Sequence, residues 1–324
     1  MYFLGYDIGG TKCAVSLGKT DGKRLDSIDI VAKEKFETKG TPYEVLDKMV
    51  SCAKDILGKE GISFSDISRA GISCGGPLDS KRGVILSPPN LPGWDEIYAV
   101  KHIEERTGVK TLLQNDANAC AVAEWKFGAG RGCSNMIFLT FGTGLGAGLI
   151  LDGKLYSGTN DNAGEAGHVR LSQNGPVGYG KIGSFEGFCS GSGIEQLGRS
   201  YATEAFQRGE KVSFCEGMHD LASITAKKIA ECADAGDELA RAVYAKSGEM
   251  LGYGLSMLVD ILNPEKIVIG SVFTRSRHLL FPECDKVMKK MCLPLSYGVC
   301  SVEGAALGEN IGDYAALALA VSDM

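Results

Sequence analysis

Residues 7–12 read Asp7-Ile8-Gly9-Gly10-Thr11-Lys12, and residues 140–146 read Thr140-Phe141-Gly142-Thr143-Gly144-Leu145-Gly146. Each stretch lies between apolar runs that are typical of paired strands, so each predicts the turn of a β-hairpin. Glycine lets the backbone adopt a positive φ and approach a ligand closely, so successive N–H groups can converge on phosphate oxygens. The threonine hydroxyls add donors, and the two turns together predict two lobes that bind one phosphate chain.

These turns do not match the common phosphate-binding loops of α/β proteins. Neither has the spacing of a Walker P-loop, and neither opens a helix in the manner of a G-x-G-x-x-G dinucleotide site. Hairpins also need glycine for steric reasons alone, so either turn by itself fits a protein without a ligand. The recurrence of threonine favours a nucleotide site built from two hairpins. Asp7 ends its apolar run, and a carboxylate beside a phosphate cradle can hold hydrated Mg²⁺.

Length and composition limit the possible functions. The chain has 324 residues, which suits two domains, and its hydrophobic content of 44% is that of a globular protein. The formal net charge is −6 and no long basic block occurs, which argues against nucleic acid as a partner. We see no secretory pattern and no apolar run of membrane-spanning length. The eleven cysteines are scattered without a C-x-x-C pair. We therefore expect a cytoplasmic protein that acts on a small molecule.

Alternating strand and helix patterns predict an α/β protein of two lobes. We expect a smaller lobe over residues 1–115 and a larger lobe over residues 116–303. A C-terminal helix over 304–324 is expected to complete the smaller lobe. The first long helix has a well-marked start, because Thr41 and Glu44 form a capping box with a proline at the first helical position.

Asp116 follows the strand expected over 110–113 and precedes an apolar helix, which places it at a helix N-terminus. Aspartate is a preferred N-cap, so capping alone explains it. In the alternative, Asp116 is a general base, because a sugar hydroxyl that attacks a γ-phosphate needs an acceptor for its proton. Asn115 beside it can hold neighbouring hydroxyls.

The glycine-rich region 158–193 has little regular pattern and is long for a connector, so we expect it to build a site. It carries Glu165, His168 and Glu186. Each of these alone fits a solvated or structural role. Together with the Asn-Asp pair at the helix start, they form a set of hydrogen-bonding groups suited to a polyol. Such a site discriminates between sugars, because a missing hydroxyl leaves buried polar groups unpaired.

Three further segments have weaker signals. The loops 74–79 and 87–94 contain many Gly and Pro residues, which turn chemistry explains. Asn90 and Trp94 are the residues in them that favour a binding role. Residues 263–271 have the pattern of a helix end, a buried strand and a tight turn, which can accommodate an adenine, although most of this segment fits ordinary scaffold.

With these motifs in this order, the chain resembles the ROK family of repressors and sugar kinases, which has the two-lobed actin-like, ribonuclease H-like ATPase fold. The resemblance runs from residues 7–12 through Leu262-Asn263-Pro264-Glu265 to the final helix. It implies a glucokinase-like enzyme that phosphorylates a hexose with ATP in a cleft between the lobes. N-acetylmannosamine, allose and fructose are the alternative substrates. The resemblance also implies a homodimer.

The resemblance implies roles for individual residues as well. Asp116 is the implied general base, and Asp7 is the implied holder of Mg²⁺ through water. The residues implied around the sugar are Gly76, Asn90, Asn115, Asp116, Glu165, His168 and Glu186. Those implied around ATP are Asp7, Gly9, Gly10, Thr11, Lys12, Thr140, Gly142, Thr143, Gly144 and Gly270.

The chain departs from the family pattern in two places. Family members usually follow Glu-x-Gly-His with C-x-C-G-x-x-G-C-x-E, whose cysteines bind a structural zinc together with the histidine. Here Val177, Tyr179 and Ser184 replace all three thiolates, so this segment cannot form a tetrahedral zinc site. We expect no zinc and a loop held by packing. In addition, Gly270-Ser271 replaces a common Gly-Gly pair near the expected adenine position.

A non-catalytic sugar sensor is the alternative of another class, since some family members are repressors. Those members carry an N-terminal helix-turn-helix segment, whereas this sequence begins directly with the phosphate-binding strand. The chain also retains Asp7 and Asp116, neither of which a sensor needs. These features favour an enzyme.

Overall fold

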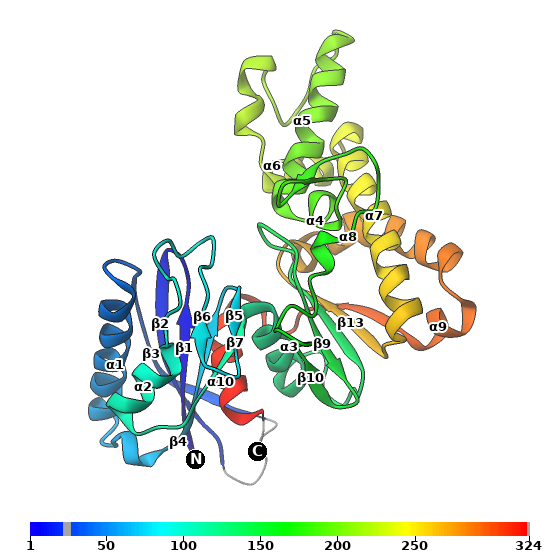
Figure 1. The fold of residues 1–324 in the computed structure, drawn as a ribbon. Helices are drawn as coiled ribbons and strands as arrows, with labels where there is room; N and C mark the ends of the chain where they lie inside the picture. Colours follow the sequence, from blue (N-terminus) through cyan, green and yellow to red (C-terminus); the bar gives the residue numbers. More distant parts are fainter. Residues whose placement is uncertain (22–26, 323–324) are drawn as a thin grey trace. The chain divides into compact units, whose positions relative to one another are not determined.

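The computed structural model describes residues 1–21 and 27–322, which form two compact units. Unit 1 comprises Met1–Phe138, Gly148–Gly164 and Ala306–Met324, and unit 2 comprises Leu139–Ala147 and Glu165–Ala305. Strands and helices alternate along the chain, which confirms the predicted α/β class (Figure 1). The C-terminal helix belongs to unit 1, and so do residues 116–138, which lie beyond the boundary predicted at residue 116.

A five-stranded sheet organises unit 1. Its strands are β1 (Tyr2–Ile8), β2 (Lys12–Lys19), β3 (Asp29–Glu37), β4 (Ile67–Cys74) and β7 (Thr111–Asn115), in the order β3-β2-β1-β4-β7. The first three are antiparallel neighbours, whereas β1, β4 and β7 run parallel. The register places Asp7 beside Ser73 and Cys74 beside Asn115. The carboxyl ends of the three parallel strands therefore meet at one edge of the sheet.

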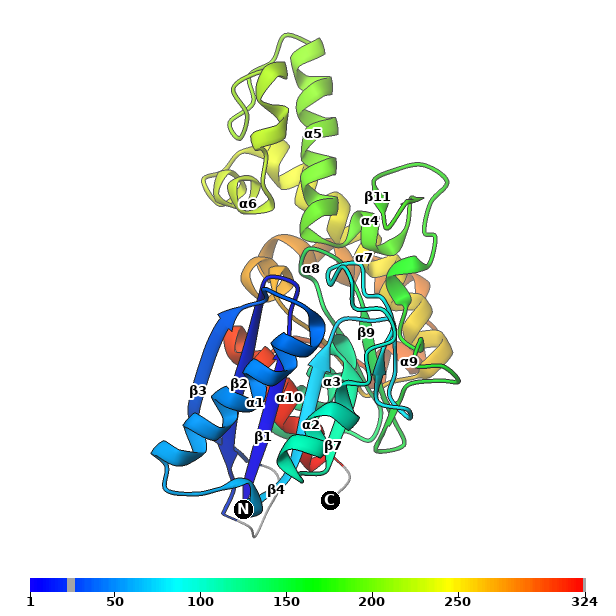
Figure 2. The same ribbon diagram turned by 60° about the vertical axis from the view of Figure 1, so that its left-hand side comes forward.

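Helices cover both faces of this sheet (Figure 2). Helices α1 (Pro42–Lys59) and α2 (Ala99–Thr107) lie over one face, and α10 (Ile311–Val321) packs against β1 and β4 on the other. The approach of α10 requires glycine in β4, because a Cβ at Gly71 would lie 2.1 Å from the carbonyl oxygen of Ala316. Two buried apolar layers thus enclose the strand that carries Asp7.

Local sequence signals predicted the start of helix α1 correctly and the start of the C-terminal helix α10 incorrectly. Helix α1 begins at the predicted capping box, in which Thr41 and Glu44 exchange hydrogen bonds between side chain and backbone. The helix predicted from residue 304 is wrong at its start. Residues Ser301–Gly304 form strand β14, and the helix begins only at Ile311. Residues 301–304 pair with β13 (Lys266–Ile269), and the N–H of Ala305 donates to the carbonyl of Ile269 at 3.0 Å. The N–H groups of Ala306 and Leu307 donate to the carboxylate of Glu124, so tertiary contacts override the helical propensity of these residues.

The rest of unit 1 continues the alternation. After β4 come the short hairpin β5 (Leu78–Asp79) and β6 (Val84–Ile85), then α3 (Asp116–Phe127), β8 (Met136–Leu139), β9 (Ala147–Leu151) and β10 (Lys154–Tyr156). The last three strands lie in the order β10-β9-β8. Helix α3 packs against α10. The strands predicted on either side of the second glycine turn are thereby confirmed.

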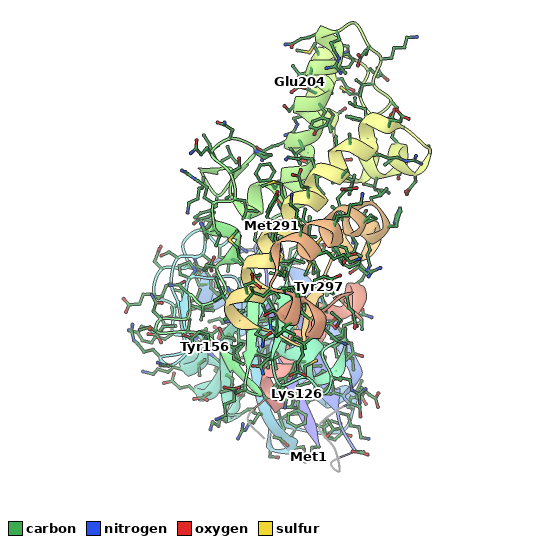
Figure 3. All side chains as sticks on the ribbon, turned by 90° about the vertical axis from the view of Figure 1, so that its right-hand side faces the viewer. Met1, Lys126, Tyr156, Glu204, Met291 and Tyr297 are labelled. Carbon is green, nitrogen blue, oxygen red and sulfur yellow. The ribbon has the colours of Figure 1, made fainter. Side chains whose placement is uncertain are left out.

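Unit 2 is mainly helical. Its helices are α4 (Phe185–Phe188), α5 (Gly191–Gln207), α6 (Ala226–Asp234), α7 (Glu238–Leu262), α8 (Val272–Met291) and α9 (Pro294–Val299). Its strands are β11 (Val177–Gly178), β12 (Lys181–Ile182), β13 (Lys266–Ile269) and β14. Helix α7 ends at Asn263 as predicted, in the left-handed conformation. Figure 3 shows Met291 and Tyr297 on the α8–α9 segment, where the Tyr297 hydroxyl donates to Asp285 at 2.6 Å.

Crossing a bilayer requires a helix that is both long and apolar. Among residues 1–21 and 27–322, none of the helices combines these two properties to the extent that a crossing needs.

Candidate active site

The first glycine turn closes the hairpin between β1 and β2. Across it, the Gly9 N–H donates to the carbonyl of Lys12 at 3.2 Å. A side chain at Gly10 would collide with the loop above it, since its Cβ would lie 2.3 Å from the carbonyl oxygen of Asn90. Within the described part of the chain, no hydrogen bond uses the N–H groups of Gly10 and Thr11, and both residues are exposed. These two amides are therefore available to an anion.

Asp7 lies near the end of β1, in a cluster of charged groups. Its pKa is raised to about 7, first by burial and then by the carboxylates of Asp313 and Asp116, against the opposing charges of Lys33 and Lys35. Concentrated negative charge of this kind attracts a divalent cation. In the described residues, no three or more His, Cys, Asp or Glu side chains are arranged to ligate one ion. The contact of Asp7 with hydrated Mg²⁺ through water therefore stays a prediction.

The junction between β7 and α3 carries Asn115 and Asp116. The prediction that Asp116 occupies the N-cap is wrong by one residue. Asn115 is the N-cap, and its Oδ1 accepts from the N–H of Ala117 at 2.9 Å. Asp116 is the exposed first residue of the helix, and its Oδ1 accepts from the same N–H at 2.7 Å. The positive end of the helix dipole suits a carboxylate at this position.

Three residues predicted to bind sugar lie together in unit 1. A Cβ at Gly76 would lie 3.1 Å from Nδ2 of Asn115, and a Cβ at Gly75 would lie 3.2 Å from Oδ1 of Asn90. Asn90 also reaches the first glycine turn, because its carbonyl oxygen approaches Gly10. The structure thus brings the two side-chain amides, the small residues between them and the exposed turn amides into one neighbourhood.

The second glycine turn lies in unit 2. The Thr140 hydroxyl stays within the turn, because it accepts from the N–H of Gly146 at 2.8 Å. The Gly142 N–H donates to the carbonyl of Gly144 at 3.1 Å. Thr143 is exposed, and the described residues contain no hydrogen bond from the N–H groups of Thr143 and Gly144. The groups of this turn that can donate to a ligand are therefore the N–H groups of Thr143 and Gly144 and the hydroxyl of Thr143. The hydroxyl of Thr140 is already used within the turn.

The second turn packs against the segment predicted to lie near adenine. The Gly270 N–H donates to the carbonyl of Leu139 at 3.0 Å, and the Gly191 N–H donates to the carbonyl of Gly142 at 2.7 Å. The strand end at Gly270 and the start of α5 thus support the turn from two sides.

Glu165 and His168 lie three residues apart, with Oε2 and Nε2 separated by 3.6 Å. The imidazole packs edge-on against the ring of Tyr179, with centroids 5.0 Å apart. Both polar side chains are about half exposed, so they are accessible to a ligand. These contacts orient the His168 ring without using all of its hydrogen-bonding capacity.

Glu186 has a different environment. Its Oε2 accepts from the N–H of Leu145 at 3.0 Å, and a Cβ at Gly144 would lie 2.6 Å from the same oxygen. The predicted sugar ligand is therefore tied to the second glycine turn within unit 2. A carboxylate has further lone pairs, so Glu186 can still accept from a hydroxyl.

The hairpin that replaces the zinc segment is held by hydrogen bonds. The side chain of Gln196 accepts from the N–H of Val177 at 2.9 Å and donates to its carbonyl at 2.8 Å. Ser184 caps α4 by accepting from the N–H of Gly187 at 3.1 Å. Tyr179 packs against the imidazole of His168. All three positions that would carry thiolates thus have other stabilising contacts.

Sequence reasoning missed two groups of charged residues. Asp313 is paired with Lys33 and contributes to the electrostatics of Asp7. A lone acid within the otherwise apolar C-terminal helix was the available signal. Glu124 is fully buried, and its carboxylate accepts from the N–H groups of Ala306 and Leu307 at 3.1 and 2.9 Å. It fixes the segment that precedes α10.

Comparison with known proteins identifies the family of this chain. The model of the ROK family matches residues 3–322. The chain belongs to the ROK family. A glucokinase of Halalkalibacterium halodurans is 29% identical over 313 residues, which cover 96% of this ROK protein and 92% of the glucokinase. A solved ROK glucokinase from Streptomyces griseus, in complex with glucose and AMPPNP, is 29% identical with a TM-score of 0.74, and 99% of each chain is covered.

Similarity within the ROK family also extends to a regulator. The DNA-binding transcriptional repressor Mlc of Escherichia coli K12 is 27% identical over 276 residues, which cover 85% of this chain and 66% of the repressor. The comparisons confirm the predicted family and fold class, and they leave the choice between kinase and regulator to the chemistry of the site.

Proposed function

We propose that this ROK protein is an ATP-dependent sugar kinase that transfers the γ-phosphoryl group of ATP to a hexose hydroxyl, with Asp116 as general base. One observation carries the proposal. In unit 1, an exposed carboxylate lies at the strand edge that also holds Asp7, and the exposed turn amides of Gly10 and Thr11 adjoin the loop of Asn90. This grouping of exposed backbone amides, a carboxylate and side-chain amides supports the roles proposed for them: hydrogen bonds to phosphate, acceptance of a proton and binding of sugar.

The proposed reaction assigns a task to each group. Asp116 removes the proton of the sugar hydroxyl as the hydroxyl oxygen forms a bond to the γ-phosphorus of ATP. The bond between the γ-phosphorus and the oxygen that bridges to the β-phosphate breaks, and ADP leaves. The Gly10 and Thr11 amides bind phosphate oxygens, and unit 2 offers Thr143 and Gly144 as further donors. Asp7 would hold Mg²⁺ through water, and the bound ion would neutralise charge on the phosphates.

Glucose is the proposed substrate, because the proteins similar to this chain include glucokinases. Asn90 and Asn115 present side-chain amides in unit 1. In unit 2, Glu165 and His168 are half-exposed and Glu186 is partly buried. Amide and carboxylate groups of this kind pair with both the donor and the acceptor of a hydroxyl. N-acetylmannosamine, allose and fructose remain the alternatives.

We also propose that two copies associate and that the protein works in the cytoplasm. All eleven cysteines are unbridged, as in a reducing compartment.

The association of two copies is supported by an apolar surface around the C-terminal end of α7 and α9, where Ile261 is 75% exposed and Leu295 is 88% exposed. Burial between copies would remove this apolar surface from water. Sedimentation velocity should show a dimer for the natural chain and a monomer for Leu295→Glu, and a monomer in both would refute the association.

A non-catalytic sugar sensor is the second candidate, favoured by the similarity to the Mlc repressor. The decisive experiment measures ADP release with Mg-ATP across hexoses and N-acetylhexosamines. Turnover on one sugar supports the kinase. Sugar-dependent thermal stabilisation without turnover on any of them favours the sensor.

A further inference from the structure

Unit 1 contains a cavity that the proposed reaction does not use. It has a volume of about 540 Å³ and is lined by β7, α3, the turn 80–83, β10 with its flanking residues and the end of α10. This volume lies within the range of pockets that hold small molecules. The residues proposed to bind sugar and phosphate are not among those that line it.

Apolar side chains form much of the cavity wall. Trp125 is the largest of them, and it is fixed by a hydrogen bond from its Nε1 to the carbonyl of Cys133 at 2.7 Å. The ammonium group of Lys126, labelled in Figure 3, lies 4.3 Å from the centroid of the indole. The indole is therefore a rigid surface against which an apolar or aromatic body can pack. The other apolar lining residues include Val100, Leu113, Val122, Leu155 and Leu319.

A buried amide also lines the cavity. Gln114 is only 7% exposed, and its Oε1 accepts from the N–H of Asn115 at 2.7 Å and from Nδ2 of Asn118 at 3.2 Å. Because the backbone N–H can only donate, these bonds fix which side-chain atom is oxygen. The other atom is a nitrogen, and among the described residues it donates no hydrogen bond. Gln114 lines the cavity, so this nitrogen can donate to an acceptor on a ligand.

The charged residues that line the cavity are cationic. They are Lys81, Arg82 and Lys154, and no carboxylate side chain lines it. The guanidinium of Arg82 forms an ion pair with the carboxylate of Glu96 at 3.1 Å. Lys81 and Lys154 form no ion pair within the described part of the chain. A second carboxylate, that of Asp161, accepts two hydrogen bonds at 2.8 Å from the lining residue Ser80. Two ammonium groups are thus left for an anion.

From the apolar side chains around Trp125, the side-chain amide of Gln114 and the two lysines, we propose that this cavity binds a small organic anion, with a phosphate monoester as its chemical class. The terminal phosphate oxygens meet Lys81, Lys154 and the Gln114 amide, and the organic part packs against Trp125. Gln114 also holds the N-cap residue Asn115, so the ligand contacts a residue that supports the start of α3. The inference stands independently of the proposed kinase function.

The test uses the two tryptophans of the chain. In Trp94→Phe, Trp125 is the sole indole, and its fluorescence reports on the cavity. We expect a saturable change with phenyl phosphate at a Kd below about 1 mM, which is an ordinary affinity for a small ligand. Inorganic phosphate lacks the aromatic ring and phenol lacks the phosphate group, so each should bind at least about tenfold more weakly than phenyl phosphate. Titration calorimetry on the natural chain repeats the measurement without the tryptophan change.

Two double variants locate the binding. Lys81→Ala with Lys154→Ala should weaken phenyl phosphate binding at least about fivefold, as expected for two charge contacts. Lys54→Ala with Lys59→Ala makes the same charge change on α1 and should leave the affinity unchanged. Saturating ATP should not displace the ligand, which distinguishes this cavity from the glycine turns. The proposal is overturned by an absence of saturable binding up to about 10 mM, by equal losses in both double variants, or by displacement with ATP.

Discussion

Replacement of Asp7 by asparagine should stabilise the metal-free protein, and increasingly so as the pH rises. The pKa of Asp7 is raised from 3.8 to about 7 by burial and by neighbouring carboxylates. The folded state therefore holds this proton more tightly than the unfolded state does. The natural chain consequently loses stability as the pH rises from about 4 to about 7, and the loss is complete above that window.

The size of the effect follows from the shift. A rise of roughly three pKa units corresponds to about 4 kcal/mol of unfavourable free energy for the ionised carboxylate at high pH, since each unit is about 1.4 kcal/mol. Part of this unfavourable free energy is already present at pH 5, because the carboxylate in the unfolded chain is mostly ionised there. Between about pH 5 and about pH 8, the stability of Asp7→Asn should therefore improve relative to the natural chain by about 2 to 3 kcal/mol.

The assay is urea unfolding followed by circular dichroism in the presence of EDTA, at several pH values across that window. Asp55→Asn, an exposed change on α1, is the control and should follow the natural chain at every pH. Parallel pH profiles for Asp7→Asn and the natural chain would refute the reasoning, because they would show that the carboxylate is not forced to ionise at a cost.

Three further predictions concern packing and the hairpin. In thermal melts, Tyr6→Phe should leave stability unchanged or raise it by up to about 1 kcal/mol, because its buried hydroxyl has no partner among the described residues. Tyr244→Phe loses a 2.9 Å hydrogen bond and should cost about 1 kcal/mol; equal losses in both variants would contradict this. Gly71→Ala should destabilise by at least about 2 kcal/mol because the new Cβ meets a backbone oxygen at 2.1 Å, whereas Gly58→Ala, with nothing within 4 Å, should stabilise by about 0.5 to 1 kcal/mol; similar melting temperatures for both would contradict this. In buffer without added Mg²⁺ or ATP, EDTA should not change the melting temperature, while Gln196→Ala should make the hairpin more sensitive to limited proteolysis; EDTA-induced proteolysis within the hairpin would show that a metal holds it.

Local signals predicted the elements whose ends are set by their own residues. The capping box at Thr41 starts α1, and Asn263 before a proline ends α7, because both act through bonds within one turn. Strand β13 (Lys266–Ile269) forms within residues 263–271, where the pattern predicted a buried strand. The start of α10 failed because a long-range strand pairing decides the conformation of residues 301–304.

The sequence indicated which backbone segments approach one another better than it indicated individual hydrogen bonds. Gly10, Asn90 and Asn115 lie together as the motifs imply, since glycine and turn signals report on close backbone approach. The use of Thr140 inside its own turn and the bond from Leu145 to Glu186 depend on side-chain geometry that spacing does not specify. Asp313 reaches Asp7 from the far end of the chain, so only the fold reveals it.

The central claim is that Asp116 accepts the proton in a phosphoryl transfer to sugar. The most direct measurement compares ADP release by the natural chain and by Asp116→Asn on the sugar that the natural chain uses best, together with sugar binding by calorimetry. We predict a fall in turnover of at least about a hundredfold with little change in the Kd for sugar. Turnover near the natural rate in Asp116→Asn would contradict the account.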